Sequence, residues 1–344
     1  MKYALLGNTG LVVSRLAFGA MTFTAGNRDL ATIFKVGEAV ADRLVGRAFD
    51  AGVNFFDTAD GYAGGESETL LGAAIKTRRQ QVVLATKVGF RTGAPLTQAG
   101  LSRRHILWSV DQSLKRLGTD WIDIYLVHRE DPHTPLEETL SALDAVVRAG
   151  KVRYLGFSNW SAWRTAAALE IQRANGLAQF THGQMYYSLL GRDVEMEVIP
   201  MMHRYQLGLT VWSPLAAGFL SGKYSRSSLS DPQNRLSGYD FLPFDKDRGF
   251  ELVEKMREIA AAHDASVAQV AIAWLLSRGT VSSVLIGATK IEQLDDNLGA
   301  VDLSLTAADL AALDAATTKP SMYPAWFAEK LADQAVEHVL APPP

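Results

Sequence analysis

The feature that most constrains the fold is a regular alternation of short apolar runs with stretches of helical character. Helical stretches are predicted at 38–51, 66–77, 102–117, 136–149 and 161–174. Apolar runs of strand length flank and follow them, at 16–19, 53–56, 82–86, 122–127, 152–157, 178–184, 209–212 and 281–286. Strands that alternate with helices through short turns form a parallel sheet, and eight such units close a barrel. The sequence therefore predicts an α/β fold, a single (β/α)8 TIM barrel domain spanning 1–344.

Four segments depart from this rhythm. Glycine-rich turn residues separate two strand-like stretches within 1–15, which predicts an antiparallel N-terminal hairpin. The long βα loops at 20–37 and 213–246 are expected to shape a site, because long loops on the carboxyl face of a barrel usually do. The C-terminal tail, 318–344, carries aromatic residues that could fold over the barrel mouth or pack against an outer helix.

Composition excludes several classes of protein. The net charge of −3 gives no electrostatic reason to expect nucleic acid or an anionic membrane as a partner. The absence of cysteine removes disulfides, thiolate catalysis and cysteine metal sites, and it fits a reducing cytoplasm. No signal-peptide core follows Met1, and no apolar stretch approaches the ~20 residues of a membrane helix. We therefore expect a cytoplasmic protein, whose oligomeric state the sequence does not predict.

Four protonatable side chains lie at or just past the carboxyl ends of three predicted strands: Asp57, Tyr62, Lys87 and His128. Each residue alone would more often be solvated or packed in the core. Their equivalent positions in successive units favour one shared site, because the carboxyl ends of barrel strands meet at one face.

These four groups suit proton transfer to a carbonyl oxygen. A phenol has an ordinary pKa of about 10 and becomes a useful acid near neutral pH only when its phenolate is stabilised. An ammonium group held by a carboxylate supplies that stabilisation, and a neutral imidazole can orient the carbonyl by a hydrogen bond. None of the four is a strong nucleophile and no metal is implied, so a cofactor that donates hydride is expected.

Competing chemistries leave motifs that this chain lacks. The segment from Gly218 to Lys223 is one residue short of a Walker A loop, and no H-E-x-x-H or Gly-x-Ser-x-Gly motif occurs. A retaining glycosidase would need two facing carboxylates, and Glu130 and Asp131 have no evident partner after the seventh strand. The glycine fingerprint of a doubly wound sheet is also missing.

The motifs around these residues resemble the signatures of the aldo-keto reductase superfamily. The first signature is similar to Gly52 to Tyr62 with Ser67-Glu68 and Leu71-Gly72, and the second to Leu114 to His128. The hairpin also matches, so the resemblance covers 2 to about 317 and is closest to the bacterial reductases and the potassium-channel β-subunit-like branch. It implies a (β/α)8 barrel, a nicotinamide cofactor, Tyr62 as general acid, Lys87 and Asp57 as its tuning pair, and His128 as carbonyl orienter.

The same resemblance implies a set of cofactor contacts. The carboxamide would be held by Ser158, Asn159 and Gln184, with Trp212 stacked on the nicotinamide. Residues near the phosphates would be Ser213, Pro214, Leu215, Ala216 and Gly218. Residues at the adenosine end would be Gly287, Thr289, Lys290, Gln293, Asp296 and Asn297. The alternative is that the Ser and Asn residues cap helices and that Trp212 belongs to the core.

Lys223 and Arg235, with Thr289 and Lys290, favour a pocket for a 2′-phosphate and hence NADPH over NADH. Solvated charges on a long loop are the competing interpretation of Lys223 and Arg235. Candidate walls of the substrate pocket are Met21, Phe23, Arg129, Trp160, Tyr323 and Trp326.

The sequence thus predicts reversible, NADPH-dependent reduction of an aldehyde or ketone, with no metal and with a small carbonyl or alcohol as substrate. The alternative is a nucleotide-sensing regulatory subunit of the potassium-channel β type with slow chemistry. The physiological substrate is not predicted.

Overall fold

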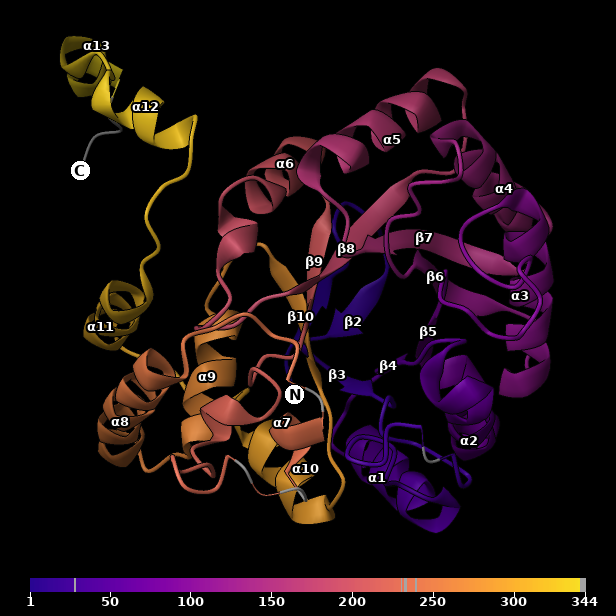
Figure 1. Ribbon diagram of the computed structural model, residues 1–344, viewed down its shortest axis with the longest axis horizontal. Coiled ribbons are helices and arrows are strands. Elements are labelled where there is room, and N and C mark those ends of the chain that lie inside the picture. Colours follow the sequence, from indigo (N-terminus) through magenta and orange to yellow (C-terminus); the bar gives the residue numbers. More distant parts are fainter. Residues whose placement is uncertain (28, 230, 232–233, 239, 341–344) are drawn as a thin grey trace.

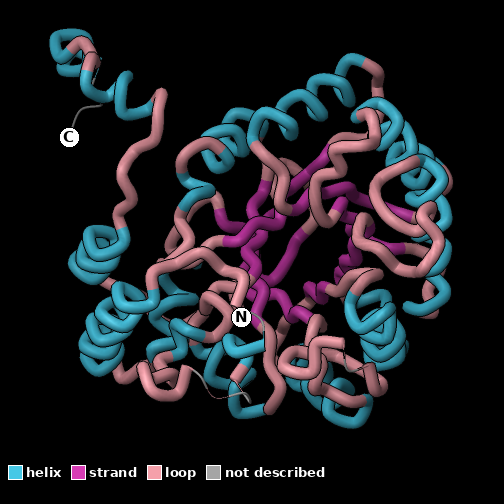
Figure 2. Tube along the Cα trace, in the orientation of Figure 1, coloured by secondary structure: helices cyan, strands magenta, loops and turns pink. Residues whose placement is uncertain are grey.

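The computed structural model describes residues 1–27, 29–229, 231, 234–238 and 240–340, and it shows a closed barrel of parallel strands inside a layer of helices (Figures 1 and 2). Each barrel strand pairs with the next along the chain, and the last pairs with the first. The barrel strands are β3 (Leu16–Gly19), β4 (Phe55–Asp57), β5 (Val83–Val88), β6 (Ile122–Val127), β7 (Val152–Ser158), β8 (Phe180–Tyr186), β9 (Gly208–Trp212) and β10 (Val281–Ile286). The predicted (β/α)8 barrel is confirmed.

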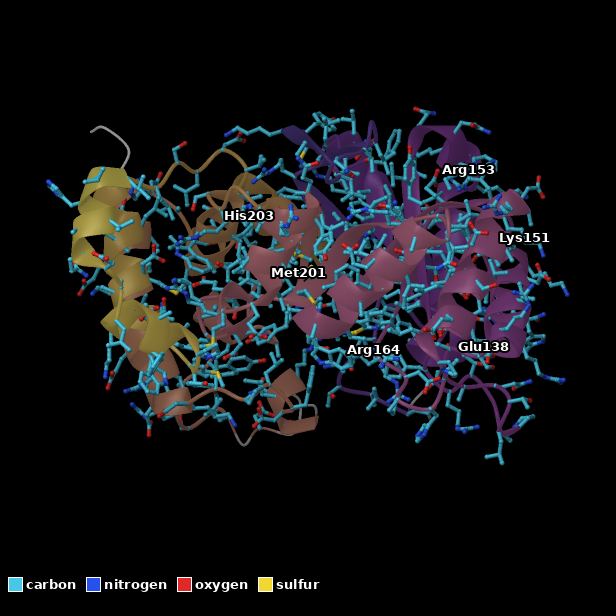
Figure 3. All side chains as sticks on the ribbon, turned by 90° about the horizontal axis from the view of Figure 1, so that it is seen from above. Glu138, Lys151, Arg153, Arg164, Met201 and His203 are labelled. Atoms are coloured by element: carbon cyan, nitrogen blue, oxygen red, sulfur yellow. The ribbon has the colours of Figure 1, made fainter. Side chains whose placement is uncertain are left out.

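Helices surround the barrel and continue into the tail. They are α1 (Glu38–Asp50), α2 (Glu66–Ile75), α3 (Arg103–Leu117), α4 (Leu136–Arg148), α5 (Ala162–Ala174), α6 (Val198–Tyr205), α7 (Arg235–Gly238), α8 (Lys246–Ala262), α9 (Val267–Leu276), α10 (Ile291–Gly299), α11 (Ala307–Thr317), α12 (Ala325–Lys330) and α13 (Gln334–Leu340). Ser102 caps α3 by accepting from the His105 amide, and Thr306 with Asp309 forms a capping box on α11. Polar side chains such as Glu138 of α4 face outward from this layer (Figure 3).

The barrel wall separates two apolar regions. Inside it, Phe55, Ala85 and Leu126 form a cluster with Leu6, which follows the hairpin strand β1 (Tyr3–Leu5), and Val13, which lies in the hairpin strand β2 (Val12–Ser14). Strand side chains alternate between the two faces of the wall, and their immediate neighbours in the chain pack against the helices. The predicted hairpin is therefore present, and it covers the amino end of the barrel.

This alternation directs the catalytic candidates inward. Asp57 follows Phe55 by two residues, Lys87 follows Ala85 by two, and His128 follows Leu126 by two, so all three continue the inner row at the carboxyl end. Lys87 lies within β5 rather than beyond it as predicted, because ladder pairing with β6 extends the strand to Val88.

The C-terminal tail extends away from the barrel, and α12 and α13 lie apart from it at the upper left of Figure 1. Tyr323 and Trp326 are exposed, and their rings contact each other at a centroid distance of 6.1 Å. Both predicted placements of these aromatics, over the barrel mouth or against an outer helix, are therefore wrong. An ion pair of 2.6 Å between Lys319 and Asp193 ties only the start of the tail to the barrel. The final residues 341–344 lie outside the described residues.

Within the described ranges no single helix is long and apolar enough to cross a membrane. Helices α8 and α9 reach that length and apolarity only as a pair, and they are bent by 89° where they meet. Helix α9 is packed in the core: its Trp274 is fully buried and lies edge-on to Tyr187 at 5.3 Å between ring centroids.

Candidate active site

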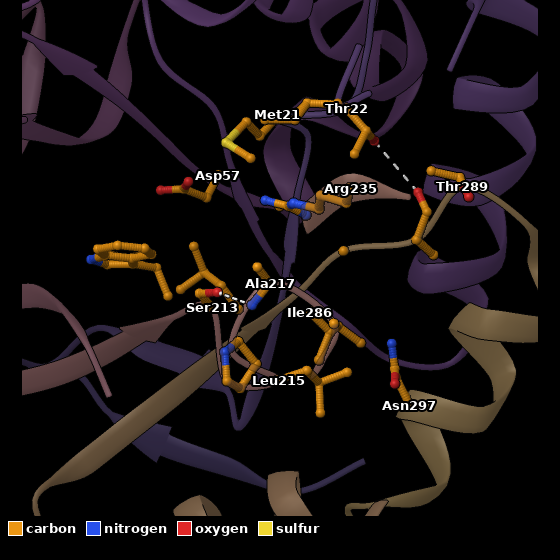
Figure 4. A pocket seen from close by; sticks show the side chains of 18 of the residues that line it. Met21, Thr22, Asp57, Ser213, Leu215, Ala217, Arg235, Ile286, Thr289 and Asn297 are labelled. Carbon is orange, nitrogen blue, oxygen red and sulfur yellow. Dashed lines mark hydrogen bonds between the residues drawn. The ribbon is translucent and has the colours of Figure 1, made fainter. Parts of the chain in front are cut away.

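A cavity of about 730 Å³ opens at the carboxyl end of the barrel. Its walls come from strand ends and from the two long loops, 20–37 and 213–246, that were expected to shape a site. Figure 4 shows side chains of both loops facing one another across it, with Asp57 at one end and Asn297 at the other. A volume of this size is typical of cofactor and substrate sites.

A buried ion pair forms the floor near Asp57. The Lys87 side chain is 0% exposed, and its Nζ donates to Asp57 Oδ1 at 2.5 Å and to the Thr58 carbonyl oxygen at 2.7 Å. Burial opposes the ammonium charge, but Asp57 and the Tyr62 oxygen outweigh it, so the pKa of Lys87 is raised. Lys87 therefore stays an ammonium, hydrogen-bonded to Tyr62 beneath the cavity surface.

His128 stands beside this pair as a neutral ring. Its centroid lies 5.5 Å from that of Tyr62 and 4.4 Å from that of Phe90, edge-on to both. Burial, with the positive charges of Lys87 and Arg129, holds the pKa of His128 well below its ordinary value. A neutral imidazole has one N–H to donate, so this side chain can hold an oxygen atom near the Tyr62 phenol.

A chain of hydrogen bonds runs from Asp57 across the floor of the cavity. Gln184 Nε2 donates to Asp57 Oδ2 at 2.9 Å, and Ser158 Oγ donates to the Gln184 carbonyl at 2.7 Å. Asn159 Nδ2 donates to Ser158 Oγ and to the His128 carbonyl, and Trp212 Nε1 donates to Asn159 Oδ1 at 3.0 Å. The groups expected at a nicotinamide are thus held rigidly next to the proton-transfer groups.

The far part of the cavity is cationic. Lys35, Lys223 and Arg235 all line it, and Arg235 projects between Met21 and Ala217 in Figure 4. The pKa of Lys223 is lowered by burial and by the positive charges of Arg235 and Lys35. A bound phosphate would relieve the mutual repulsion of these cations, so the donor set fits a phosphorylated cofactor.

The structure brings most of the predicted site residues to the cavity. Of the catalytic set, Asp57, Tyr62 and His128 line it, with Lys87 buried just beneath. Of the cofactor and substrate sets, the residues that line it are Met21, Ser158, Asn159, Gln184, Trp212, Ser213, Pro214, Leu215, Gly218, Lys223, Arg235, Gly287, Thr289, Gln293, Asp296 and Asn297.

Two predicted cofactor residues are not part of the cavity wall. Ala216 is fully buried in the core, within a turn in which residues 216–218 all have positive φ. Lys290 is exposed at the start of α10, where its side chain points to solvent.

Several predicted substrate walls are also misplaced. Phe23 and Trp160 are buried in the core, packed on Phe18 and on Phe180 respectively. Arg129 is exposed at the rim, where its guanidinium lies 5.2 Å from the Phe90 ring centroid. Tyr323 and Trp326 are carried away by the tail, as described above.

The sequence analysis missed a group of wall residues on loops. They are Thr32, Ile33, Lys35, Phe90, Ser221, Asn234 and Phe241. The available signal was position: six lie on the two long loops that were expected to shape a site, and Phe90 follows β5. Their residue types gave no further indication.

Among the described residues, no group of three or more His, Asp or Glu side chains could hold a metal ion.

Comparisons with known proteins agree with this geometry. The model of the aldo/keto reductase family matches residues 15–318, most of the chain, and the protein therefore belongs to the aldo/keto reductase family. Membership supports oxidoreductase activity in general and confirms the resemblance seen in the motifs.

Among its relatives is a protein of Oryza sativa subsp. japonica named a probable voltage-gated potassium channel subunit beta, 40% identical over 310 residues. A protein of Arabidopsis thaliana with the same name is 39% identical over 310 residues. Each alignment covers 88% of this chain and 92% of the relative.

Proposed function

We propose that this protein reduces an aldehyde or ketone to the alcohol with NADPH, with Tyr62 as the proton donor. The observation that carries the proposal is the contact of Lys87 with both Asp57 and Tyr62 at the floor of a cavity that fits a nucleotide. When bound, the cofactor supplies hydride to the carbonyl carbon. The reaction is reversible, so an alcohol with NADP+ is also a candidate substrate pair.

The chain's own residues perform the proton transfer. Lys87 stabilises the phenolate that Tyr62 becomes after it gives up its proton, and Asp57 keeps Lys87 charged and in place. His128, neutral and buried, donates a hydrogen bond that directs the carbonyl oxygen toward the phenol. Trp212, Asn159 and Ser158 would hold the nicotinamide end of the cofactor.

Tyr62→Phe tests the assignment. We expect the variant to lose nearly all reduction of a carbonyl panel, followed by NADPH absorbance, because general acid catalysis contributes about 10²–10⁴-fold. NADPH binding, measured by fluorescence titration, should change little. Tyr3→Phe is the matched control, because Tyr3 lies on the hairpin and donates to the Gly52 carbonyl far from the cavity. Full turnover by Tyr62→Phe would show that another group supplies the proton.

The preference for NADPH is part of the proposal and is supported by the cationic wall of Lys35, Lys223 and Arg235. The 2′-phosphate of NADPH would gain charge-assisted hydrogen bonds among three positive charges, and NADH lacks this group. The test is a comparison of the Kd values for NADPH and NADH in the wild-type protein, and equal values would remove this part of the proposal.

A second candidate function is a regulatory subunit that senses nicotinamide nucleotides, favoured by the names of the rice and Arabidopsis relatives. Such a protein would bind NADPH tightly, turn over carbonyls slowly and form a stable complex with a channel protein. Turnover of the carbonyl panel and co-purification with a potassium channel subunit distinguish the two candidates.

A further inference from the structure

A buried polar cluster lies behind the loop that carries Tyr62, and the proposed reaction does not use it. Alternation along the strands places it outside the barrel wall, between the wall and the helical layer. We call it the Asp60 cluster, and its members are Asp60 of the loop, Glu68 of α2, Ser109 and Arg116 of α3, and Tyr125 of β6.

The carboxyl group of Asp60 accepts few hydrogen bonds for a buried carboxylate. It is 1% exposed, and Ser109 Oγ donates to its Oδ2 at 2.8 Å. Its Oδ1 is buried and has no hydrogen-bond partner among the residues that the structure describes. An ionised carboxylate can accept about four hydrogen bonds, so this environment suits a neutral acid better than an anion.

The surrounding charges also disfavour ionisation. Arg116 Nε pairs with Glu68 Oε2 at 2.6 Å, and Thr86 donates to the other oxygen of Glu68. Glu68 is fully buried and already uses the single cation of the cluster, so an ionised Asp60 would be a second carboxylate beside one guanidinium. Burial raises the pKa of Asp60 to about 7, with a further contribution from the charge of Glu68 and opposition from Ser109, Arg116 and the Gly61 amide.

Thr58, at the start of the loop that carries Tyr62, is held independently of Asp60: its amide donates to the Ala85 carbonyl at 3.0 Å, its hydroxyl lies 2.8 Å from Ser67 Oγ, and its carbonyl accepts from Lys87 Nζ. Beyond Thr58 the loop has backbone hydrogen bonds at Asp60 and Tyr62. The Asp60 amide donates to the Lys87 carbonyl at 3.1 Å, and the Tyr62 amide donates to the Ala59 carbonyl at 3.2 Å. The three residues after Tyr62 have left-handed φ values of 49°, 66° and 94°. At Gly65, the last of them, a Cβ would lie 2.7 Å from Arg116 Cδ, so glycine is required for Arg116 to cross the turn.

We propose that Asp60 is a positioning residue for Tyr62: its side chain, anchored on Ser109 behind the barrel wall, holds the part of the loop beyond Thr58, residues 59–62, so that the phenol faces the cavity. Asp60 and Tyr62 point to opposite sides of the same short segment, one into the helical layer and the other into the site. The proposal rests on the proposed reductase function, because it concerns presentation of the proton donor of that reaction.

The protonation state of Asp60 then controls the loop. The neutral acid fits the buried cluster, whereas the anion is stabilised when the segment moves and water reaches the carboxylate. The folded-state pKa is raised above the unfolded value, so the stabilising contribution is complete below the ordinary carboxyl pKa and is lost as pH rises through about 7. Turnover should likewise fall as pH rises through about 7, where Asp60 ionises in the folded protein.

The test is the pH profile of kcat/KM for a good carbonyl substrate in the wild type, Asp60→Asn and Ser109→Ala. Asn keeps the acceptor for Ser109 but cannot ionise, so we expect a flat profile where the wild type falls about threefold or more as Asp60 ionises. The Ser109 hydrogen bond lowers the pKa of Asp60, so Ser109→Ala should move the fall to higher pH. An equal loss at every pH in Asp60→Asn, or an unchanged profile, overturns the proposal.

Amide hydrogen exchange of residues 58–65 gives a readout that does not require turnover. Above neutral pH, the amides of this segment should exchange faster in the wild type than in Asp60→Asn, and below neutral pH the two proteins should exchange at the same rate. Equal exchange rates both above and below neutral pH overturn the proposal. Asp120→Asn is the control, because Asp120 is an exposed acid near the start of β6. If exchange behaves as expected but no carbonyl is reduced, the reductase function fails while the positioning of the loop stands.

Discussion

Replacing Asp57 by Asn should leave an ammonium group stranded in the protein interior. Lys87 is 0% exposed, and its Nζ donates to Asp57 Oδ1 at 2.5 Å, to the Thr58 carbonyl at 2.7 Å and to the Tyr62 oxygen; of these three acceptors only Asp57 is a carboxylate. Breaking a buried pair by removing one partner costs about 3–5 kcal/mol. Burial lowers the pKa of Lys87, so without the Asp57 charge the amine can lose its proton and avoid being a buried charge. The expected loss in the free energy of unfolding is therefore near the lower end of that range, about 3 kcal/mol.

The loss of stability should depend on pH, because the pKa of Lys87 in the variant differs between the folded and unfolded states. In Asp57→Asn the folded-state pKa of Lys87 falls below the unfolded value, so the folded protein binds fewer protons than the unfolded chain. The deficit in the free energy of unfolding should therefore be largest at neutral pH and shrink as pH approaches the ordinary lysine value of about 10.4.

Urea unfolding followed by circular dichroism measures the effect. The double variant Asp57→Asn, Lys87→Met should recover much of the loss, because no charge is then buried. Glu170→Gln serves as the control: the pair of Arg173 and Glu170 is more than half exposed on both sides, and its loss should cost less than about 0.5 kcal/mol. A loss below about 1 kcal/mol in Asp57→Asn, or a double variant no more stable than the single one, would refute the reasoning.

Three further predictions follow from packing and charge. Gly72→Ala should cost about 1–3 kcal/mol in urea unfolding, because its Cβ would lie 2.3 Å from the Leu117 carbonyl oxygen. Gly46→Ala in α1, with no atom closer than 3.8 Å, should not destabilise, and equal effects of the two would contradict this. Arg235→Ala should raise the Kd for NADPH about tenfold more than the Kd for NADH in fluorescence titrations, and parallel losses would argue against a phosphate contact. Burial lowers the pKa of His182 to about 3, so its contribution to stability is present above about 6.5 and lost as pH falls toward 3; His182→Gln should flatten that part of the stability profile, and an unchanged slope would count against it.

The residues that the sequence located well are those that a strand positions. Asp57, Lys87 and His128 follow apolar runs buried on both faces, and the two-residue period of a strand fixes their direction once the strand is known. Ser158 and Gln184 came instead from the resemblance to the family, and they lie at the last residue of β7 and within β8. The barrel itself was predictable because its period repeats through the chain.

The residues that the sequence located poorly lie on loops and in the tail, where side chains do not alternate with the regular period of a strand. Phe241 and Lys35 sit on long loops, whose course depends on contacts that no local pattern records. Trp160 lies two residues beyond the end of β7, and a change of backbone direction there decides between cavity and core. The aromatic residues of the tail indicated apolar surface, but composition does not say which surface a helix packs against, so their position was not predicted correctly.

The hairpin covers the amino end of the barrel, and the cavity described above opens at the opposite, carboxyl end. Leu6 and Val13 pack inside the barrel with Phe55, Ala85 and Leu126. A cofactor and a substrate would therefore both enter the site from the carboxyl end of the barrel. The hairpin thus bears on access to the site although none of its residues lines the cavity.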